Sequence, residues 1–150
     1  IQVGIRTNND EHRAQAKRFG VEVIEAAQCR DLRRLDIATP VYISMDIDGL
    51  DPAFAPGVSH REPGGLSTRQ VLELFQGIRQ PIVAADIVEY NPLNDVRDLT
   101  GRVAAKFVKE LAGLLRASGD LLGRTAISVL GLLGWLVFRT MNYSSVDRKE

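Results

Sequence analysis

The sequence predicts an α/β fold of three layers, in which helices cover both sides of a mainly parallel sheet. Short apolar and β-branched runs alternate along the chain with segments of helical periodicity, an order that is typical of βα units. The strongest run, residues 41–45, is apolar at nearly every position, which indicates a strand buried on both faces. We expect one domain over residues 1–117 and a divergent tail over residues 118–150.

The first forty residues contain two expected strands and two expected helices. Apolar β-rich runs define the strands, and a polar segment with a solvated face defines the first helix. The second helix is expected to end before Pro40, because proline lacks a backbone N–H and disfavours a helical residue before it. These elements are placed at 1–5 (strand), 8–18 (helix), 21–24 (strand) and 29–35 (helix).

After the strand at 41–45, the chain is expected to form a loop, a helix, a strand and a second helix. Prolines and glycines mark residues 49–66 as the loop, and Ser67 and Gln70 then have the spacing of a capping box. The helix behind them has one apolar face, formed by Val71, Leu72, Phe75 and Ile78. A strand follows at 82–88, and the helix at 100–115 carries an apolar stripe of Val103, Phe107, Leu111 and Leu114.

Composition and charge are those of an ordinary globular domain. The formal net charge is +0 and both signs are interspersed, so we expect no binding to nucleic acid or to an acidic membrane surface. The single cysteine, Cys29, has no internal disulfide partner, which favours a reducing compartment. The sequence begins with Ile1, so no leader peptide is read from it.

The tail contains an uncharged apolar run, residues 125–138, flanked by Arg124 and Arg139. A membrane-spanning helix needs about 20 apolar residues, and this run is shorter. We therefore expect the tail to pack on the domain or to bind protein rather than to span a membrane.

Three carboxylates follow directly on the strand at 41–45, and they are Asp46, Asp48 and Asp51. Because alternate residues of a strand point to one side, we expect Asp46 and Asp48 to project together. At ~5 Å and an effective dielectric constant of ~20, two such charges repel by about 3 kcal/mol, so we expect a cation to compensate them. The carboxyl ends of parallel strands bind ligands, and carboxylate oxygens suit Mg²⁺ or Mn²⁺.

Two enzyme classes contain a pattern of this kind. In HAD-type phosphatases an apolar strand ends in Asp-x-Asp-Gly, as the run DIDG at 46–49 does, and the first Asp is a nucleophile. That pattern expects Thr or Val next, where this chain has Leu50, and it expects a downstream lysine and acidic pair that we do not find. The phosphatase hypothesis is therefore kept as the less favoured alternative.

The second class is the ureohydrolase family of arginases and agmatinases, which the chain resembles in three separate motifs. The run SMDIDGLDP at 44–52 is similar to the family signature Ser-x-Asp-x-Asp-x-x-Asp-Pro. DIVEYNP at 86–92 is similar to its strand-end motif, and VAAK at 103–106 lies where its late helix begins. The loop GVSHREPGG at 57–65 resembles the plant-type arginase branch. The resemblance covers residues 1–115 and implies an arginase-like fold, C-terminal half only.

The resemblance also implies roles for individual residues around two Mn²⁺ ions. Asp46 would be a ligand shared by both ions, and Asp48 a ligand of one of them. Glu89 would hold the substrate guanidinium by paired charge-assisted hydrogen bonds. His60 is assigned to the substrate-binding mouth of the site, with a purely structural loop histidine as the alternative. Asp51 would organise the loop rather than bind metal.

The implied reaction is manganese-dependent hydrolysis of the guanidino C–N bond of L-arginine, which gives ornithine and urea. Agmatine, giving putrescine and urea, is the alternative substrate, and a non-catalytic interaction module is the alternative function. The family's other metal ligands lie in Gly-Gly-Asp-His and Asp-Ala-His-x-Asp segments, which this sequence lacks. We therefore expect the chain alone to be inactive, and the complete enzyme to be a cytoplasmic or mitochondrial homo-oligomer.

Overall fold

The computed structural model describes residues 1–29 and 35–122, and its strands form two parallel pairs. β1 pairs with β2, and β3 pairs with β4. The strands are β1 (Gln2–Ile5), β2 (Val23–Glu25), β3 (Val41–Asp46) and β4 (Ile82–Val88). The helices are α1 (Asp10–Arg18), α2 (Thr68–Gly77) and α3 (Leu99–Leu122), with single 3₁₀ turns at Ala26–Gln28, Ile47–Gly49 and Pro92–Asn94. The prediction of an α/β fold with parallel strands is confirmed.

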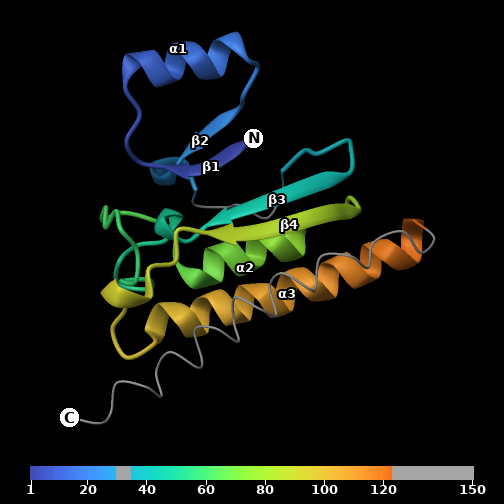
Figure 1. The fold of residues 1–150 in the computed structure, drawn as a ribbon. Helices are drawn as coiled ribbons and strands as arrows, with labels where there is room; N and C mark the ends of the chain where they lie inside the picture. Colours follow the sequence, from blue (N-terminus) through green and yellow to red (C-terminus); the bar gives the residue numbers. More distant parts are fainter. Residues whose placement is uncertain (30–34, 123–150) are drawn as a thin grey trace.

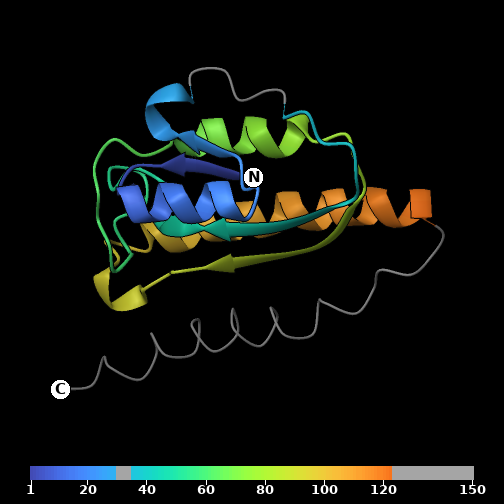
Figure 2. The same ribbon diagram turned by 90° about the horizontal axis from the view of Figure 1, so that it is seen from above.

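Helices lie on two sides of the strands. In Figure 1, α1 lies above β1 and β2, while α2 and α3 lie below β3 and β4. The view from above shows β3 and β4 running in the same direction, beside α3 (Figure 2). In their register Asp46 stands opposite Val88, so the segments that follow the two strands leave the sheet at the same edge. This edge is where the sequence predicts the site.

The core lies between β3, β4 and the two helices below them. Ser67 caps α2 as predicted, because its side chain accepts from the backbone N–H of Gln70 and the Gln70 side chain accepts from the N–H of Ser67. Phe75 of α2 meets Phe107 of α3 edge-to-face, with ring centroids 5.6 Å apart. Val71, Leu72 and Phe75 are buried as expected, whereas Ile78 is half-buried and caps the C-terminus of α2.

A hub of hydrogen bonds between Asp95, Thr100 and Gly57 fixes the start of α3. Asp95 accepts hydrogen bonds from the backbone N–H groups of Thr100 and Gly101, at 3.0 and 2.9 Å. The hydroxyl of Thr100, a residue with no exposed surface, accepts the N–H of Gly57 at 2.7 Å. A Cβ at Gly57 would stand 2.8 Å from Asp95, so only glycine lets the loop approach the helix this closely. The hub ties the loop before α2 to the helix after β4.

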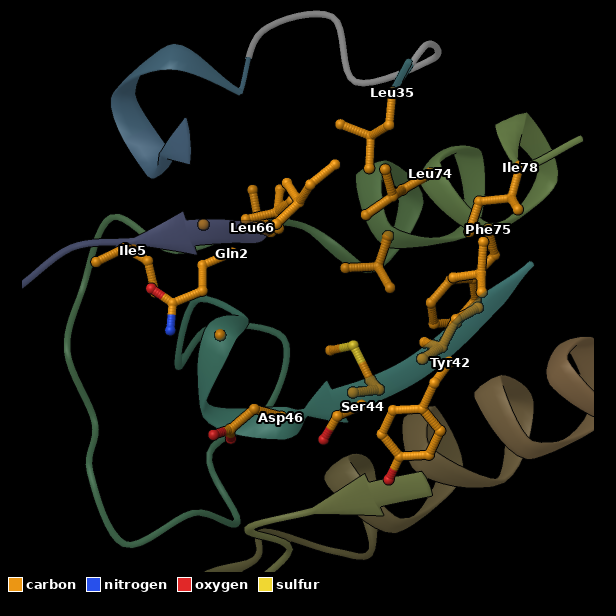
Figure 3. A pocket seen from close by; sticks show the side chains of 18 of the residues that line it. Gln2, Ile5, Leu35, Tyr42, Ser44, Asp46, Leu66, Leu74, Phe75 and Ile78 are labelled. Carbon is orange, nitrogen blue, oxygen red and sulfur yellow. The ribbon is translucent and has the colours of Figure 1, made fainter. Parts of the chain in front are cut away.

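β3 differs from its predicted burial on both faces. Tyr42 is 57% exposed, and Ser44 and Asp46 on the same face are exposed as well. Figure 3 shows these three side chains following one another along the strand. The hydroxyls of Tyr42 and Ser44 both donate to the carboxylate of Asp86 on β4, the second at 2.7 Å. Within residues 1–29 and 35–122 no element covers this face of β3. If β3 is buried on both faces, the second face is covered by residues outside these ranges.

Two expectations fall on residues outside the described ranges. The helix expected at 29–35 is preceded by the 3₁₀ turn Ala26–Gln28, and residues 30–34 are not described. The apolar run at 125–138 also lies outside the description. Among the described helices none is long and apolar enough to cross a bilayer.

Candidate metal centre

Asp46 and Asp48 come together through a tight turn rather than along a strand. β3 ends at Asp46, and Asp48 lies in the 3₁₀ turn Ile47–Gly49 that follows at once. The Asp46 carboxylate caps this turn by accepting the backbone N–H of Asp48 at 3.1 Å. The sequence predicted that Asp46 and Asp48 project to one side of the same strand. This reason is wrong, because the strand ends at Asp46 and Asp48 lies in the turn. The turn nevertheless keeps both carboxylates at the sheet edge.

Three side chains from separate parts of the chain meet at this edge. Asp48, His60 and Glu89 each offer a ligand atom, and these atoms lie within 4.8 Å of one another. Nδ1 of His60 is 3.9 Å from Oδ2 of Asp48. The His60 side chain is 84% exposed and that of Asp48 is 24% exposed, so the cluster opens directly to solvent. The structure thus brings together Asp48, His60 and Glu89. Asp46, the fourth residue that the sequence assigned to the site, is hydrogen-bonded to Asp48 beside them.

Glu89 occupies an unusual backbone conformation. It follows β4 directly and has a φ of 63°, in the left-handed region that non-glycine residues rarely adopt. Such a residue costs of order 1–3 kcal/mol and persists only when its surroundings enforce it. Here the next two residues are fixed, since the Tyr90 hydroxyl donates to Asp95 at 3.3 Å and the Asn91 N–H donates to the carbonyl of Gly57 at 2.8 Å. In this backbone conformation, Glu89 has a carboxylate oxygen within 4.8 Å of ligand atoms on Asp48 and His60.

The long loop that carries His60 is held at both ends. At its start, Asp51 accepts the N–H groups of Ala53 at 2.9 Å and of Gly64 at 2.7 Å. Near His60, the guanidinium of Arg61 donates to the carbonyls of Pro56 and Asn94, both at 2.8 Å. Asp51 therefore has the loop-organising place that the sequence suggested, and Arg61 fixes the backbone next to His60.

Like charges gather at the site. Burial, together with the neighbouring carboxylates of Asp48 and Glu89, raises the pKa of Asp46 from 3.8 to about 6. In the described ranges no lysine or arginine is paired with these carboxylates, and His60 lies 3.9 Å from Asp48. A bound cation would offset the repulsion that raises this pKa.

The donor set fits a divalent transition-metal ion. Carboxylate oxygens from Asp46, Asp48 and Glu89 are hard ligands, and the imidazole nitrogen of His60 is of intermediate softness. Mn²⁺ accepts both kinds of ligand, whereas Zn²⁺ structural sites favour more nitrogen and sulfur. The described residues thus suit Mn²⁺ and leave part of its coordination shell to be completed.

The raised pKa makes the stability of the metal-free protein depend on pH in a defined direction. Asp46 binds its proton more tightly folded than unfolded, so its contribution to stability is present below about pH 4 and is lost as the pH rises through about 6. We expect Asp46→Asn to raise the melting temperature of chelator-treated protein at about pH 8, and to leave it nearly unchanged at about pH 4. An equal shift at both pH values would contradict the charge explanation.

Sequence reasoning missed two polar residues that contact the elements of the site. Arg6, after β1, donates to the main chain of the 3₁₀ turn that holds Asp48. Asp86 of β4 binds the hydroxyls of Tyr42 and Ser44. Each contact joins residues more than 40 positions apart, so no local spacing signals it. Each residue lies in or directly after a predicted parallel strand, and Asp86 also begins the quoted run DIVEYNP, in which it was given no role.

Comparison with known proteins gives one consistent result. The arginase family matches residues 1–113 of the chain. "Arginase 1, mitochondrial" of Arabidopsis thaliana is 51% identical over 120 residues, which are 75% of this chain and 35% of the relative. The chain therefore spans about a third of the length of these curated relatives.

Solved structures agree with the sequence comparison. The arginase of Medicago truncatula superposes with a TM-score of 0.72 at 46% identity, covering 77% of this chain and 39% of that one. A triple mutant of the T. brucei arginase-like protein, bound with Mn²⁺, has a TM-score of 0.69 at 38% identity, covering 77% and 41%. These matches decide against the phosphatase hypothesis, and with the carboxylates at the sheet edge they show that this chain belongs to the arginase family.

Proposed function

We propose that the protein carrying this chain is a manganese-dependent arginase, which hydrolyses L-arginine to ornithine and urea. The observation that carries the proposal is the meeting of Asp48, His60 and Glu89 within 4.8 Å, beside Asp46, at the carboxyl edge of two parallel strands. The arginase-family match over residues 1–113 supports guanidino chemistry at this edge. This chain would contribute one part of the site.

In this proposal Asp46 and Asp48 hold the metal. Asp46 accepts the N–H of Asp48, which orients its carboxylate along the turn, and Asp48 stands 3.9 Å from His60. Two Mn²⁺ ions, when bound, would supply Lewis acidity and a water whose pKa is lowered toward neutrality. The carboxylates neutralise and position those ions, and the exposed His60 limits the mouth of the site.

Glu89 is proposed to bind the guanidinium group of the substrate. A carboxylate accepts two parallel N–H bonds from a planar guanidinium, which fixes both its position and its plane. Glu89 is exposed, close to Asp48, and held by a strained backbone, as a pre-oriented substrate-binding group would be. A guanidinium held by Glu89 would lie next to Asp48, because their ligand atoms are within 4.8 Å of each other.

The described residues supply too few ligands for two ions. Asp48, His60 and Glu89 form the cluster and Asp46 lies beside it, whereas a binuclear site holds its ions roughly 3.5–4 Å apart by ligands from opposing elements. The matched relatives are about three times as long as the matched segment, since it covers 35% of their length. We therefore propose that segments equivalent to the rest of those relatives complete the site. A non-catalytic arginase-like module is the alternative, and it predicts no metal-dependent turnover.

We propose arginine rather than agmatine as the substrate. The loop His60-Arg61-Glu62 resembles plant arginases, and the chain is 51% identical to one of them. We expect kcat/KM of the complete protein to be at least ~10²-fold higher for arginine, because a site that binds the α-carboxylate rejects an analogue that lacks it. Urea release from each substrate, assayed side by side with Mn²⁺, measures the ratio. A preference for agmatine would assign the protein to the agmatinases.

The cellular setting follows the same relatives. Several of them are named mitochondrial or chloroplastic, so we propose a mitochondrial enzyme, with the cytoplasm as the alternative. We further propose that the complete enzyme is a homo-oligomer.

A further inference from the structure

We propose that Arg6 is a positioning residue for the metal site, acting through the main chain of Asp48. The inference rests on the proposed metal-binding role of Asp48 and adds a residue that neither the sequence motifs nor the ligand cluster contains. Arg6 lies directly after β1, on the far side of the cleft from β3. It is half-buried, and its guanidinium reaches the turn that carries Asp48.

The guanidinium of Arg6 donates two hydrogen bonds to the main chain of the 3₁₀ turn and the residue after it. One terminal nitrogen donates to the carbonyl of Leu50 at 3.1 Å, and the other donates to the carbonyl of Asp48 itself. Asp46 holds the opposite side of the same residue, since it accepts the Asp48 N–H at 3.1 Å. Asp48 is therefore fixed at both its backbone N–H and its backbone carbonyl. Its side chain has only its own two torsions left to vary.

The chain leaves a space for this guanidinium. A Cβ on Gly65 would stand 2.0 Å from a terminal nitrogen of Arg6 and 2.5 Å from the backbone of Leu50 and Asp51. Gly65 therefore lets the loop close over Arg6. Around it, the N–H of Leu66 donates to Gly49 at 3.1 Å and the N–H of Asp51 donates to Leu66 at 2.9 Å. The guanidinium is thus enclosed by the two ends of the loop that carries His60.

Arg6 also bridges two parts of the fold that share no strand pairing. In the described ranges β1 pairs with β2 and β3 pairs with β4, but no ladder joins β1 to β3. A cleft of about 1330 Å³ lies between these strands, and Figure 3 shows Gln2 and Ile5 of β1 on one side and Asp46 on the other. Arg6 contacts the ligand turn where the cleft meets the site. Arg6 therefore ties the end of β1 to this turn by direct hydrogen bonds, beside the close approach of Gly4 to Leu66.

These contacts predict a specific defect when Arg6 is replaced. Without the two donors of Arg6, the carbonyls of Asp48 and Leu50 would bond to water instead. The backbone of the turn would then be less fixed, and so would the carboxylate of Asp48. Residues that orient metal ligands typically change metal affinity by roughly 10–100-fold when they are replaced. Glu89, the proposed substrate-binding group, follows β4, whereas the hydrogen bonds of Arg6 go to the carbonyls of Leu50 and Asp48, so substrate affinity should remain once metal is bound.

The test uses the complete protein that carries this chain, stripped of metal and titrated with Mn²⁺ alone, with free Mn²⁺ measured by electron paramagnetic resonance. We expect Arg6→Met to bind Mn²⁺ roughly 10–100-fold more weakly, and Arg6→Lys to fall between, because lysine keeps the charge but bonds one carbonyl at a time. Arg13→Met is the matched control, since Arg13 pairs with Glu25 on the surface at 2.9 Å. At saturating Mn²⁺, kcat and KM of Arg6→Lys should return to those of the unmodified protein.

Unchanged Mn²⁺ affinity in Arg6→Lys and Arg6→Met, whatever their melting temperatures, would overturn the inference. So would a loss of kcat that saturating Mn²⁺ does not restore, or an equal loss of affinity in Arg13→Met. If Arg6→Met does not fold, Arg6→Lys alone decides the result. Unmodified protein that binds Mn²⁺ but releases no urea would contradict the proposed function, while weaker binding by the Arg6 variants would still support the inference.

Discussion

Asp48→Ala is expected to abolish urea release by the complete protein, lowering kcat/KM at least about 10³-fold, and Asp46→Ala should do the same. Both carboxylates stand at the end of β3, where burial and mutual repulsion raise the pKa of Asp46 to about 6. Removing either one takes away a negative ligand and lets the remaining carboxylate turn. Stabilisation by a bound metal contributes several kcal/mol to such reactions, and each 1.36 kcal/mol is a factor of ten.

The measurement combines urea release with Mn²⁺ binding by calorimetry. Both variants should bind Mn²⁺ more weakly, and Asp46→Ala should keep or raise the melting temperature of metal-free protein because repulsion is relieved. Asp10→Ala is the matched control, since Asp10 is an exposed carboxylate in the first turn of α1. Near-normal turnover in either site variant would show that the metal is held elsewhere.

Glu89→Gln should lower kcat/KM by roughly 10²–10⁴-fold with less than about a tenfold change in Mn²⁺ affinity. The amide has the same shape, but it loses the charge that two hydrogen bonds to a guanidinium use, at about 1.5–3 kcal/mol each. Gln also has no branched Cβ, so the backbone φ of 63° should be kept. The loss should therefore be chemical rather than structural.

Mn²⁺ titration of Glu89→Gln distinguishes a substrate-binding role of Glu89 from a metal-ligand role. Its carboxylate lies within 4.8 Å of donor atoms on Asp48 and His60, so a metal ligand is the competing assignment. A large loss of Mn²⁺ affinity in Glu89→Gln would move it from the substrate to the metal. Retained affinity with turnover lost would support the guanidinium role.

Local patterns predicted the elements that position the site. The strand at 82–88 has the bounds of β4, and Ser67 with Gln70 forms the expected capping box. Both follow from interactions within a few residues, namely apolar β-rich composition and a side chain that caps its own helix. The placement of the carboxylates at a sheet edge followed from the order of strand and loop.

Contacts between distant residues were beyond the reach of periodicity. The alternation rule placed Asp48 on a strand. The backbone instead turns after Asp46, whose carboxylate accepts a hydrogen bond from the backbone N–H of Asp48. Arg6 reaches Leu50 across 44 positions, and no local pattern indicates this contact. Likewise, the apolar run at 41–45 indicated two buried faces, whereas Tyr42 is exposed in the described part of the chain. Such features depend on which surfaces meet.

We propose that this chain carries only part of a binuclear metal site. The most direct measurement is a urea-release assay on the purified 150-residue chain with saturating Mn²⁺ and either arginine or agmatine, with an intact plant arginase as the positive control. We expect no turnover above background, because Asp46 and Asp48 would supply only part of the ligands that two ions need. Metal-dependent urea release that disappears in Asp46→Ala would contradict it and show that the chain holds a complete site.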